Sequence, residues 1–278
     1  MKEKKRVYIT VKTYPTISEK YSELVCTAGL LEDGSWIRLY PVPFRLLRDD
    51  QKYPKYTWVE VEVEKNTTDI RCESYRPDWS TIIVNPKPKV NKIEWDNRRK
   101  IILQTGTVYT NMQIIIDLAH SDEKKSLATF KPTRILDFIV KKDTPNWDAG
   151  KLSSLLIKSN QLSLFQTEEE IKEEFRLVEK IPYKFYYKFE DDEGKVSQLM
   201  IEDWELGMLF LNCRKGAGGN EKIAIEKVRE TYFDKFLKRD TYFFLGTTQK
   251  NHRMPYPYII IGVFSSPMPP EEEQLSLF

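Results

Sequence analysis

The sequence Glu23-Leu-Val-Cys-Thr-Ala-Gly-Leu-Leu31 is followed by Glu32, by Asp33-Gly34 and by Ser35-Trp-Ile-Arg-Leu-Tyr40. An Asp-Gly pair between two β-prone segments favours a tight turn, so this stretch predicts a β-hairpin. Because side chains alternate between the two faces of a strand, Ile37 and Leu39 share one face of the second strand. Its opposite face carries two aromatic rings beside a guanidinium, from Trp36, Arg38 and Tyr40. The hairpin predicts a β-rich fold for the first part of the chain.

Further alternating segments lie on both sides of this hairpin. Residues Arg6 to Thr13 and Tyr56 to Lys65 alternate between apolar and polar side chains, and each segment predicts a strand with one buried face. The outward residues of the second segment are acidic: Glu60, Glu62 and Glu64. An acidic edge repels a phosphate backbone, so we do not expect every face of this sheet to contact nucleic acid.

The rest of the chain mixes helices with strands. Helices are predicted at 94–104, 111–119, 203–212 and 221–237, and strands at 134–142 and 183–190. On the strand 183–190, the side chains of Phe185, Tyr187 and Phe189 face one way. Those of Lys184, Tyr186 and Lys188 face the other way. The pattern as a whole predicts an α+β protein.

The changes in pattern along the chain suggest four regions. We expect a β-rich N-terminal domain with helices over residues 1–145 and a helical connector over 146–181. A C-terminal α+β domain is expected over 182–264. The remaining residues, 265–278, hold prolines and glutamates that do not fit a helix interior or a sheet, so they predict a flexible tail.

Several short segments resemble a known family. They are Cys26-Thr-Ala-Gly29, Gly34-Ser-Trp-Ile-Arg-Leu-Tyr-Pro41, Asp203-Trp-Glu205, Lys227-Val-Arg229 and Ile260-Ile-Gly-Val-Phe264. Together these segments resemble prokaryotic proteins with a dual OB-fold domain, which often occur near mobile-element and anti-phage genes. The resemblance implies two small β-barrel, OB-like halves with inserted helices. It also implies binding or sensing of nucleic acid or nucleotides, and other subunits of a defence system as partners.

Two sets of side chains have the composition of a single-strand binding surface. OB-type surfaces stack bases on aromatic rings and attract the backbone with basic side chains. Trp36, Arg38 and Tyr40 form one such set, and Lys184, Tyr186 and Lys188 form the other. Arg71 and Arg76, in a polar and aromatic stretch, are further candidate contacts. The alternative is that these amphipathic side chains cover a sheet beneath a helix.

The pentapeptide Gln-Leu-Ser-Leu-Phe occurs twice, at 161–165 and at 274–278. It resembles the Gln-Leu-x-Leu-Phe motif by which bacterial replication and repair proteins attach to the DNA sliding clamp. The resemblance implies that a glutamine bonds the rim of a clamp pocket and that the apolar side chains fill it. In the second copy the corresponding residues are Gln274, Leu275, Leu277 and Phe278. We expect this copy to dock, although an apolar end could instead fold back onto the body.

The first pentapeptide lies in a different setting. Its corresponding residues are Gln161, Leu162, Leu164 and Phe165. They follow a predicted helix at 147–158 and precede Thr167-x-x-Glu170, a capping-box pattern that begins another helix. For this copy we favour ordinary packing within a connector.

Composition limits the remaining possibilities. The chain has 44 Lys+Arg against 42 Asp+Glu, so any nucleic-acid contact must come from a local patch rather than from the net charge of +2. Three widely spaced cysteines, with no apolar run of membrane-spanning length, predict a cytoplasmic protein without disulfides. No metal site, cofactor motif or catalytic residue is expected.

A rival hypothesis is a nucleotide-sensing or nuclease-type enzyme of a defence system. It requires Arg71, Glu73, Arg76 and His252 to converge on a concave site. A third possibility is a scaffold subunit whose aromatic faces bind another protein. The enzyme signatures are weak, because the two histidines stand alone and the glycine-rich segment at 215–219 lacks the order of a phosphate-binding loop.

Overall fold

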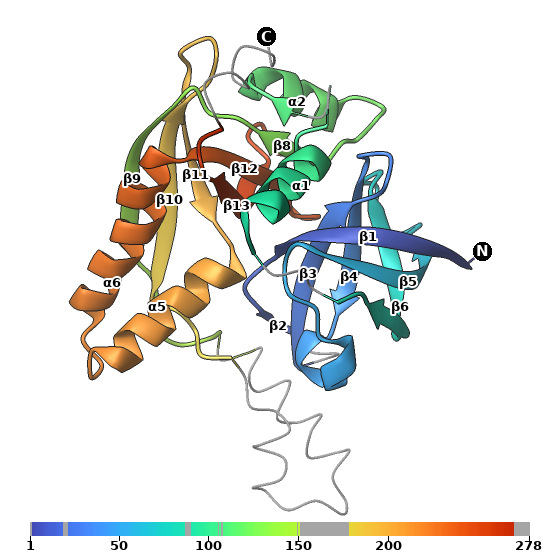
Figure 1. Ribbon diagram of the computed structural model, residues 1–278, viewed down its shortest axis with the longest axis horizontal. Coiled ribbons are helices and arrows are strands. Elements are labelled where there is room, and N and C mark those ends of the chain that lie inside the picture. The colour runs from blue at the N-terminus through green and yellow to red at the C-terminus, as the bar shows by residue number, and fades with distance from the viewer. Residues whose placement is uncertain are drawn as a thin grey trace, which may run out of the picture.

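A computed structural model describes residues 2–18, 22–86, 90–104, 106, 108–148, 150 and 178–269. These residues form two sheets that lie side by side, each with its own hydrophobic core (Figure 1). The chain is an α+β protein, as the sequence predicts. Both Gln-Leu-Ser-Leu-Phe copies, most of the predicted connector and most of the predicted tail lie outside the described residues.

The first sheet closes into a five-strand barrel. Its strands are β1 (Lys2–Lys12), β3 (Ser22–Leu30), β4 (Trp36–Val42), β5 (Thr57–Lys65) and β6 (Ser74–Val84), and a short strand β2 (Thr16–Ser18) pairs with β3. The order around the barrel is β1-β5-β6-β4-β3, and pairing of β3 with β1 closes it. Only β4 and β6 run parallel among these pairs. This barrel is compatible with an OB-like fold.

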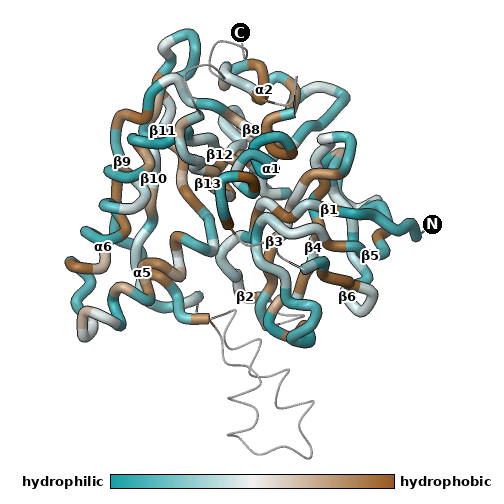
Figure 2. The backbone as a smooth tube through the Cα atoms, in the orientation of Figure 1, coloured by the Kyte–Doolittle hydropathy of each residue, from teal (hydrophilic) through white to brown (hydrophobic). Residues whose placement is uncertain are grey.

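The predicted hairpin is confirmed as β3 and β4, with Ile37 and Leu39 in the barrel core. Close packing of its first strand requires a glycine at position 29. A Cβ at Gly29 would lie 2.3 Å from the carbonyl oxygen of Tyr8 on β1. The short helices η1 (Phe44–Leu46) and η2 (Asp49–Gln51) then connect β4 to β5, and Phe44 contributes to the same core. At the start of β1, the lysine-rich N-terminal residues are hydrophilic and pair with β5 (Figure 2).

The second sheet begins after helix α1 (Lys92–Ile102). Its strands are β7 (Val108–Tyr109), β8 (Leu127–Phe130), β9 (Arg134–Lys142), β10 (Tyr183–Glu190), β11 (Val196–Ile201), β12 (Asp240–Thr247) and β13 (Tyr258–Ser266). The strand order is β7-β8-β12-β13-β11-β10-β9, with parallel pairs at β7–β8 and β11–β13. The helices are α2 (Met112–His120), α5 (Trp204–Gly216) and α6 (Glu221–Arg229), which continues through the π-helical η3 (Glu230–Lys235) into η4 (Phe236–Lys238).

The prediction of a second β-barrel is wrong. This sheet is open and mixed, and its outermost strands β7 and β9 do not pair with each other within the described part of the chain. The reason lies in how its faces are covered. One face packs against α2, α5 and α6, and the opposite face of β12 and β13 packs against the barrel. Both faces of the central strands are therefore buried without closure of the sheet.

The contact between the two domains is apolar and aromatic. Phe244, Ile261 and Phe264 of the second sheet share a buried cluster with Tyr8 and Leu30 of the barrel. The predicted N-terminal domain extended to residue 145, whereas β7, β8 and β9 are strands of the second sheet. Sequence periodicity identified β9 with its observed bounds but could not show which sheet it joins.

No helix in the described ranges is long and apolar enough to cross a membrane.

Candidate functional site

The first predicted nucleic-acid face lies at the contact between the two domains. Arg38 is 2% exposed, and its guanidinium donates to the hydroxyl of Ser126 at 2.6 Å and to the carbonyl oxygen of Thr247 at 3.4 Å. Trp36 packs edge-on against Phe244, with the ring centroids 5.5 Å apart. Tyr40 remains 37% exposed. The structure therefore places Arg38 against the second domain, where a phosphate does not reach it.

Three residues of the rival hypothesis converge beside Arg38. Arg71 donates to the carboxylate of Asp69 and to the carbonyl oxygen of Thr247. The Glu73 carboxylate accepts from the backbone N–H of Ser126 at 2.9 Å and from its hydroxyl at 2.7 Å. We call Arg38, Asp69, Arg71, Glu73 and His252 the interdomain cluster. Arg76 does not join it, because its side chain is exposed and donates to the hydroxyl of Thr68 at 2.9 Å.

His252 is the least exposed member of the interdomain cluster, at 1%. Its Nδ1 lies 2.9 Å from the hydroxyl of Thr247, whereas its Nε2 has no hydrogen-bond partner among the described residues. Burial, followed by the charge of Arg71, lowers the pKa of His252. The imidazole is therefore neutral at pH 7 and sits between matched acidic and basic groups. The arrangement suits a structural contact between the domains, since its charged groups already bond one another and the backbone.

The second predicted set lies on an exposed face of the second sheet. Lys184, Tyr186 and Lys188 alternate along β10 with the buried Phe185, Tyr187 and Phe189. Strand β9 adds Lys141, which pairs with Lys184 and whose ammonium group lies 5.0 Å from the centroid of the Tyr186 ring. We call Lys141, Lys184, Tyr186 and Lys188 the basic face. Tyr186 itself is partly exposed, between its neighbours Ile139 on β9 and Met200 on β11.

The acidic groups near the basic face are engaged at its margins. Asp137, opposite Lys188, lies 3.2 Å from the guanidinium of Arg229. Asp143 pairs with Lys180 at 2.9 Å and with Lys184 at a longer 3.4 Å. Lys188 forms no salt bridge with any residue in the described part of the chain. The Lys188 ammonium group is therefore available to an anion from solvent, and Lys184 is held only by the longer contact with Asp143.

Sequence reasoning missed Lys141 and the cavity beside this face. Lys141 lies on a correctly predicted strand, but the pairing of β9 with β10 brings together segments that are distant in sequence. The cavity has a volume of about 170 Å³, and Tyr14, Trp147, Lys184 and Glu202 are among its lining residues. Burial raises the pKa of Glu202, against the opposing charge of Lys184. A glutamate that follows a strand gives no signal in sequence that it will face such a cavity.

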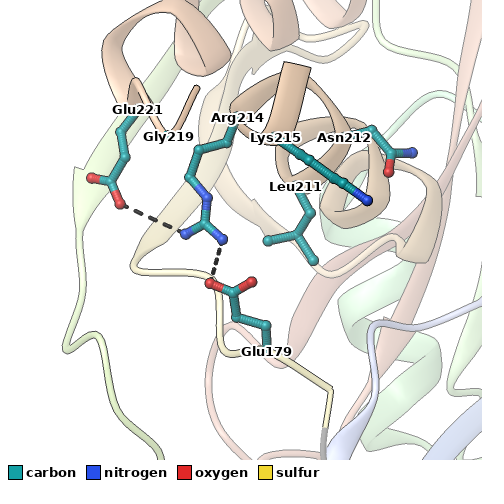
Figure 3. A pocket seen from close by; sticks show the side chains of 7 residues that line it. All are labelled: Glu179, Leu211, Asn212, Arg214, Lys215, Gly219 and Glu221. Atoms are coloured by element: carbon teal, nitrogen blue, oxygen red, sulfur yellow. Dashed lines mark hydrogen bonds and ion pairs between the residues drawn. The ribbon is translucent and has the colours of Figure 1, made fainter. Parts of the chain in front are cut away.

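Two larger cavities have mixed charge. One, of about 450 Å³, lies between the domains and is lined by Glu73, Trp36, Tyr109 and Lys125, among others. The other, of about 610 Å³, lies beside α5 and is open to solvent. There Arg214 lies between Glu179 and Glu221, while Lys215 and Asn212 extend away from this group (Figure 3). Its acidic and basic groups are equal in number, so it favours neither charge of ligand.

Metal-ligating groups do not gather in the described residues. No set of three or more His, Cys, Asp or Glu side chains there is arranged to hold an ion. The cysteines Cys26, Cys72 and Cys213 are all free thiols.

Comparisons with known proteins divide the chain where the two sheets meet. A family model described as "Domain of unknown function (DUF8758)" matches residues 3–104, which hold the barrel and α1. A second, described as "Domain of unknown function (DUF8757)", matches residues 108–278, more than half of the chain. The search of curated proteins gave no match. The N-terminal barrel is similar to the domain described as DUF8758, and the chain belongs to the family described as "Domain of unknown function (DUF8757)".

Proposed function

We propose that this chain is a nucleic-acid-binding accessory protein that is recruited to the DNA sliding clamp through its C-terminal Gln-Leu-Ser-Leu-Phe peptide. The observation that carries nucleic-acid binding is the basic face, where three lysines surround one partly exposed tyrosine on an open sheet. A role in replication, repair or anti-phage defence would follow from this recruitment.

The basic face has the two chemical properties that a single strand requires. Base stacking on an aromatic ring contributes about 1 to 3 kcal/mol per base, and lysines neutralise the phosphates on either side. For single strands the slope of log K against log salt is about −0.7 per neutralised phosphate. Lys141, Lys184 and Lys188 together would therefore contribute a slope of about −2.

The proposal assigns different tasks to the two domains. In OB folds the second and third strands carry the ligand face. In this barrel these are β3 and β4, and Arg38 of β4 bonds the second domain. We therefore assign single-strand binding to the second sheet and structural support to the barrel. The finer resemblance of the N-terminal domain to the dual OB-fold family is part of the same proposal.

Clamp recruitment is supported by the two pentapeptides alone, both of which match the clamp motif at its four specified positions. The test is retention of the full chain on immobilised clamp. A variant carrying Leu277→Ala and Phe278→Ala is expected not to be retained on the clamp. A variant carrying Leu164→Ala and Phe165→Ala is expected to be retained. Equal retention of the first variant and the unaltered chain would refute recruitment by the terminal copy.

Single-strand binding is tested by fluorescence anisotropy with labelled oligonucleotides at several salt concentrations. Tyr186→Ala is expected to weaken binding about 5- to 150-fold, the equivalent of one lost stacking contact. Lys184→Glu with Lys188→Glu is expected to weaken binding and reduce the salt slope.

Two matched variants control for general effects of charge and aromatic content. Lys222→Glu changes an exposed lysine on α6, and Tyr256→Ala removes a ring that is 75% exposed. Neither is expected to change affinity by more than about twofold, because both lie outside the basic face. If the control variants weaken binding as much as the basic-face variants do, the assignment of the face is wrong.

A further inference from the structure

The cavity of about 170 Å³ lies where the basic face ends against the barrel. Tyr14, between β1 and β2, forms its barrel side, and Trp147, which follows β9, forms another wall. Lys184 belongs both to the basic face and to this cavity. The cavity is thus continuous with the surface to which we assign the single strand.

Hydrogen bonds to the backbone fix the walls of the cavity. The Tyr14 N–H donates to the carbonyl oxygen of Glu202 at 3.4 Å, and the Tyr14 hydroxyl donates to that of Glu179 at 2.6 Å. The indole N–H of Trp147 donates to the carbonyl oxygen of Val178 at 3.0 Å. Both rings are therefore held in place without a ligand, which lowers the cost of binding one.

Glu202 also lines the cavity, but across the described ranges its carboxyl group lacks the kind of hydrogen bond that holds Tyr14 and Trp147. It follows β11 two residues after Met200, so both side chains lie on the side of the sheet that carries Tyr186. Its carboxyl group forms no hydrogen bond or salt bridge with the residues that the structure describes. Glu202 is partly buried, and this burial raises the pKa of its carboxyl group against the opposing charge of Lys184. A partly desolvated carboxylate with no partner in the described part of the chain is costly, and such groups in clefts are candidates for ligand contacts.

The size and lining of the cavity restrict what it can accept. Pockets for drug-sized ligands begin at about 300 Å³, so this one accommodates a single ring system but not a whole nucleotide. Aromatic and apolar side chains line most of it, including Tyr14, Trp147 and Met200. Enzymes that read an unstacked base use this combination of flat apolar walls and a polar group at the base edge.

We propose that the cavity receives one base of the bound single strand and that Glu202 selects bases with an exocyclic amino group. This inference rests on the proposed function, because the sugar and phosphate would lie on the basic face beside Lys184. A carboxylate only accepts hydrogen bonds, and the amino groups of cytosine, adenine and guanine donate them. Thymine and uracil present carbonyl oxygens at that position, which the carboxylate repels.

The test compares labelled oligo-dC and oligo-dT of equal length by fluorescence anisotropy at neutral pH. The unaltered chain is expected to bind oligo-dC about tenfold more tightly than oligo-dT. Glu202→Gln is expected to reduce this preference to less than about twofold, because an amide both donates and accepts. Glu193→Gln, in the exposed turn between β10 and β11, is the matched control and should keep the full preference.

A second measurement follows Trp147 directly. Oligo-dC is expected to change the tryptophan fluorescence of the unaltered chain, and Trp147→Phe should lose most of this change. Glu202→Gln removes a partly buried charge, so this variant is expected to fold at least as stably as the unaltered chain, as circular dichroism would show.

The outcomes separate this inference from the proposed function. If neither oligonucleotide binds, the proposed function fails and the cavity proposal fails with it. A second outcome is that both oligonucleotides bind with equal affinity, with binding that depends on Tyr186 and is unaffected by Glu202→Gln. That result would mean that the strand lies on the basic face but no base enters the cavity. Loss of preference in the Glu193→Gln control would also overturn the assignment of Glu202.

Discussion

Lys55→Met is expected to loosen the contact between the barrel and the second domain. The Lys55 ammonium lies 2.9 Å from one Asp203 carboxylate oxygen and 3.2 Å from the other. Both side chains are only 1% exposed. Although burial by itself lowers the pKa of Lys55, the carboxylates of Asp203 and Glu205 raise it above the usual lysine value, so the ammonium remains charged.

The free energy of unfolding that Lys55→Met removes depends on the Asp203 carboxylate, which the substitution leaves without its counter-charge. Asp203 also accepts from the backbone N–H of Glu205 at 2.8 Å and from that of Val263 at 3.2 Å. Without Lys55, a buried carboxylate would keep these two neutral donors and lose its counter-charge. Breaking a buried pair in this way costs about 3 to 5 kcal/mol. Combining Lys55→Met with Asp203→Asn should cost less than the sum of the two single changes, since no unpaired charge remains.

The assay is urea denaturation followed by both tryptophan fluorescence and circular dichroism. Lys52→Met is the matched control, because Lys52 pairs with Asp49 at 2.8 Å in a bridge whose aspartate is 97% exposed. It should change the free energy of unfolding by less than about 0.5 kcal/mol. A loss below about 1 kcal/mol for Lys55→Met, or additive effects in the double variant, would refute the reasoning.

Three further predictions concern the barrel and the interdomain cluster. Gly29→Ala is expected to cost at least about 2 kcal/mol in urea denaturation, because the new Cβ would contact the carbonyl oxygen of Tyr8. Because the pKa of His252 is lower in the fold than in the unfolded chain, stability should fall as pH drops below about 6.5, by up to about 1.4 kcal/mol per pH unit. His252→Gln should remove that part of the pH dependence, and an unchanged profile would contradict it. Burial and then Glu73 raise the pKa of the exposed Cys72 thiol to about 12, so it should react slowly with iodoacetamide at pH 8, as mass spectrometry would show.

Local pattern predicted the elements of the fold better than their assembly. The Asp33-Gly34 turn and the alternation beside it determined the hairpin of β3 and β4, because turn chemistry and strand period act over a few residues. The helix predicted at 111–119 is α2, whose N-terminus Asn111 caps by accepting from two backbone N–H groups. Closure or opening of a sheet depends on which distant strands pair, and the sequence contains no local signal for that.

The two candidate surfaces show the same limit. Trp36 with Arg38, and Tyr186 with Lys184, have the same pattern of aromatic and basic residues at strand spacing. The structure places the first pair against the second domain and the second pair on an exposed face. An aromatic ring beside a cation suits a protein interface and a nucleic-acid surface equally well, so the residues alone could not distinguish them.

The aromatic contact between the domains also constrains how this chain can change over generations. The second domain inherited without the barrel would expose Phe244 and Phe264 to solvent, and the barrel inherited alone would expose Tyr8. A recombination event that exchanged one half would have to supply a complementary set of rings at once. We therefore expect the two domains to be inherited together, with the junction between them near residues 104 to 108 preserved.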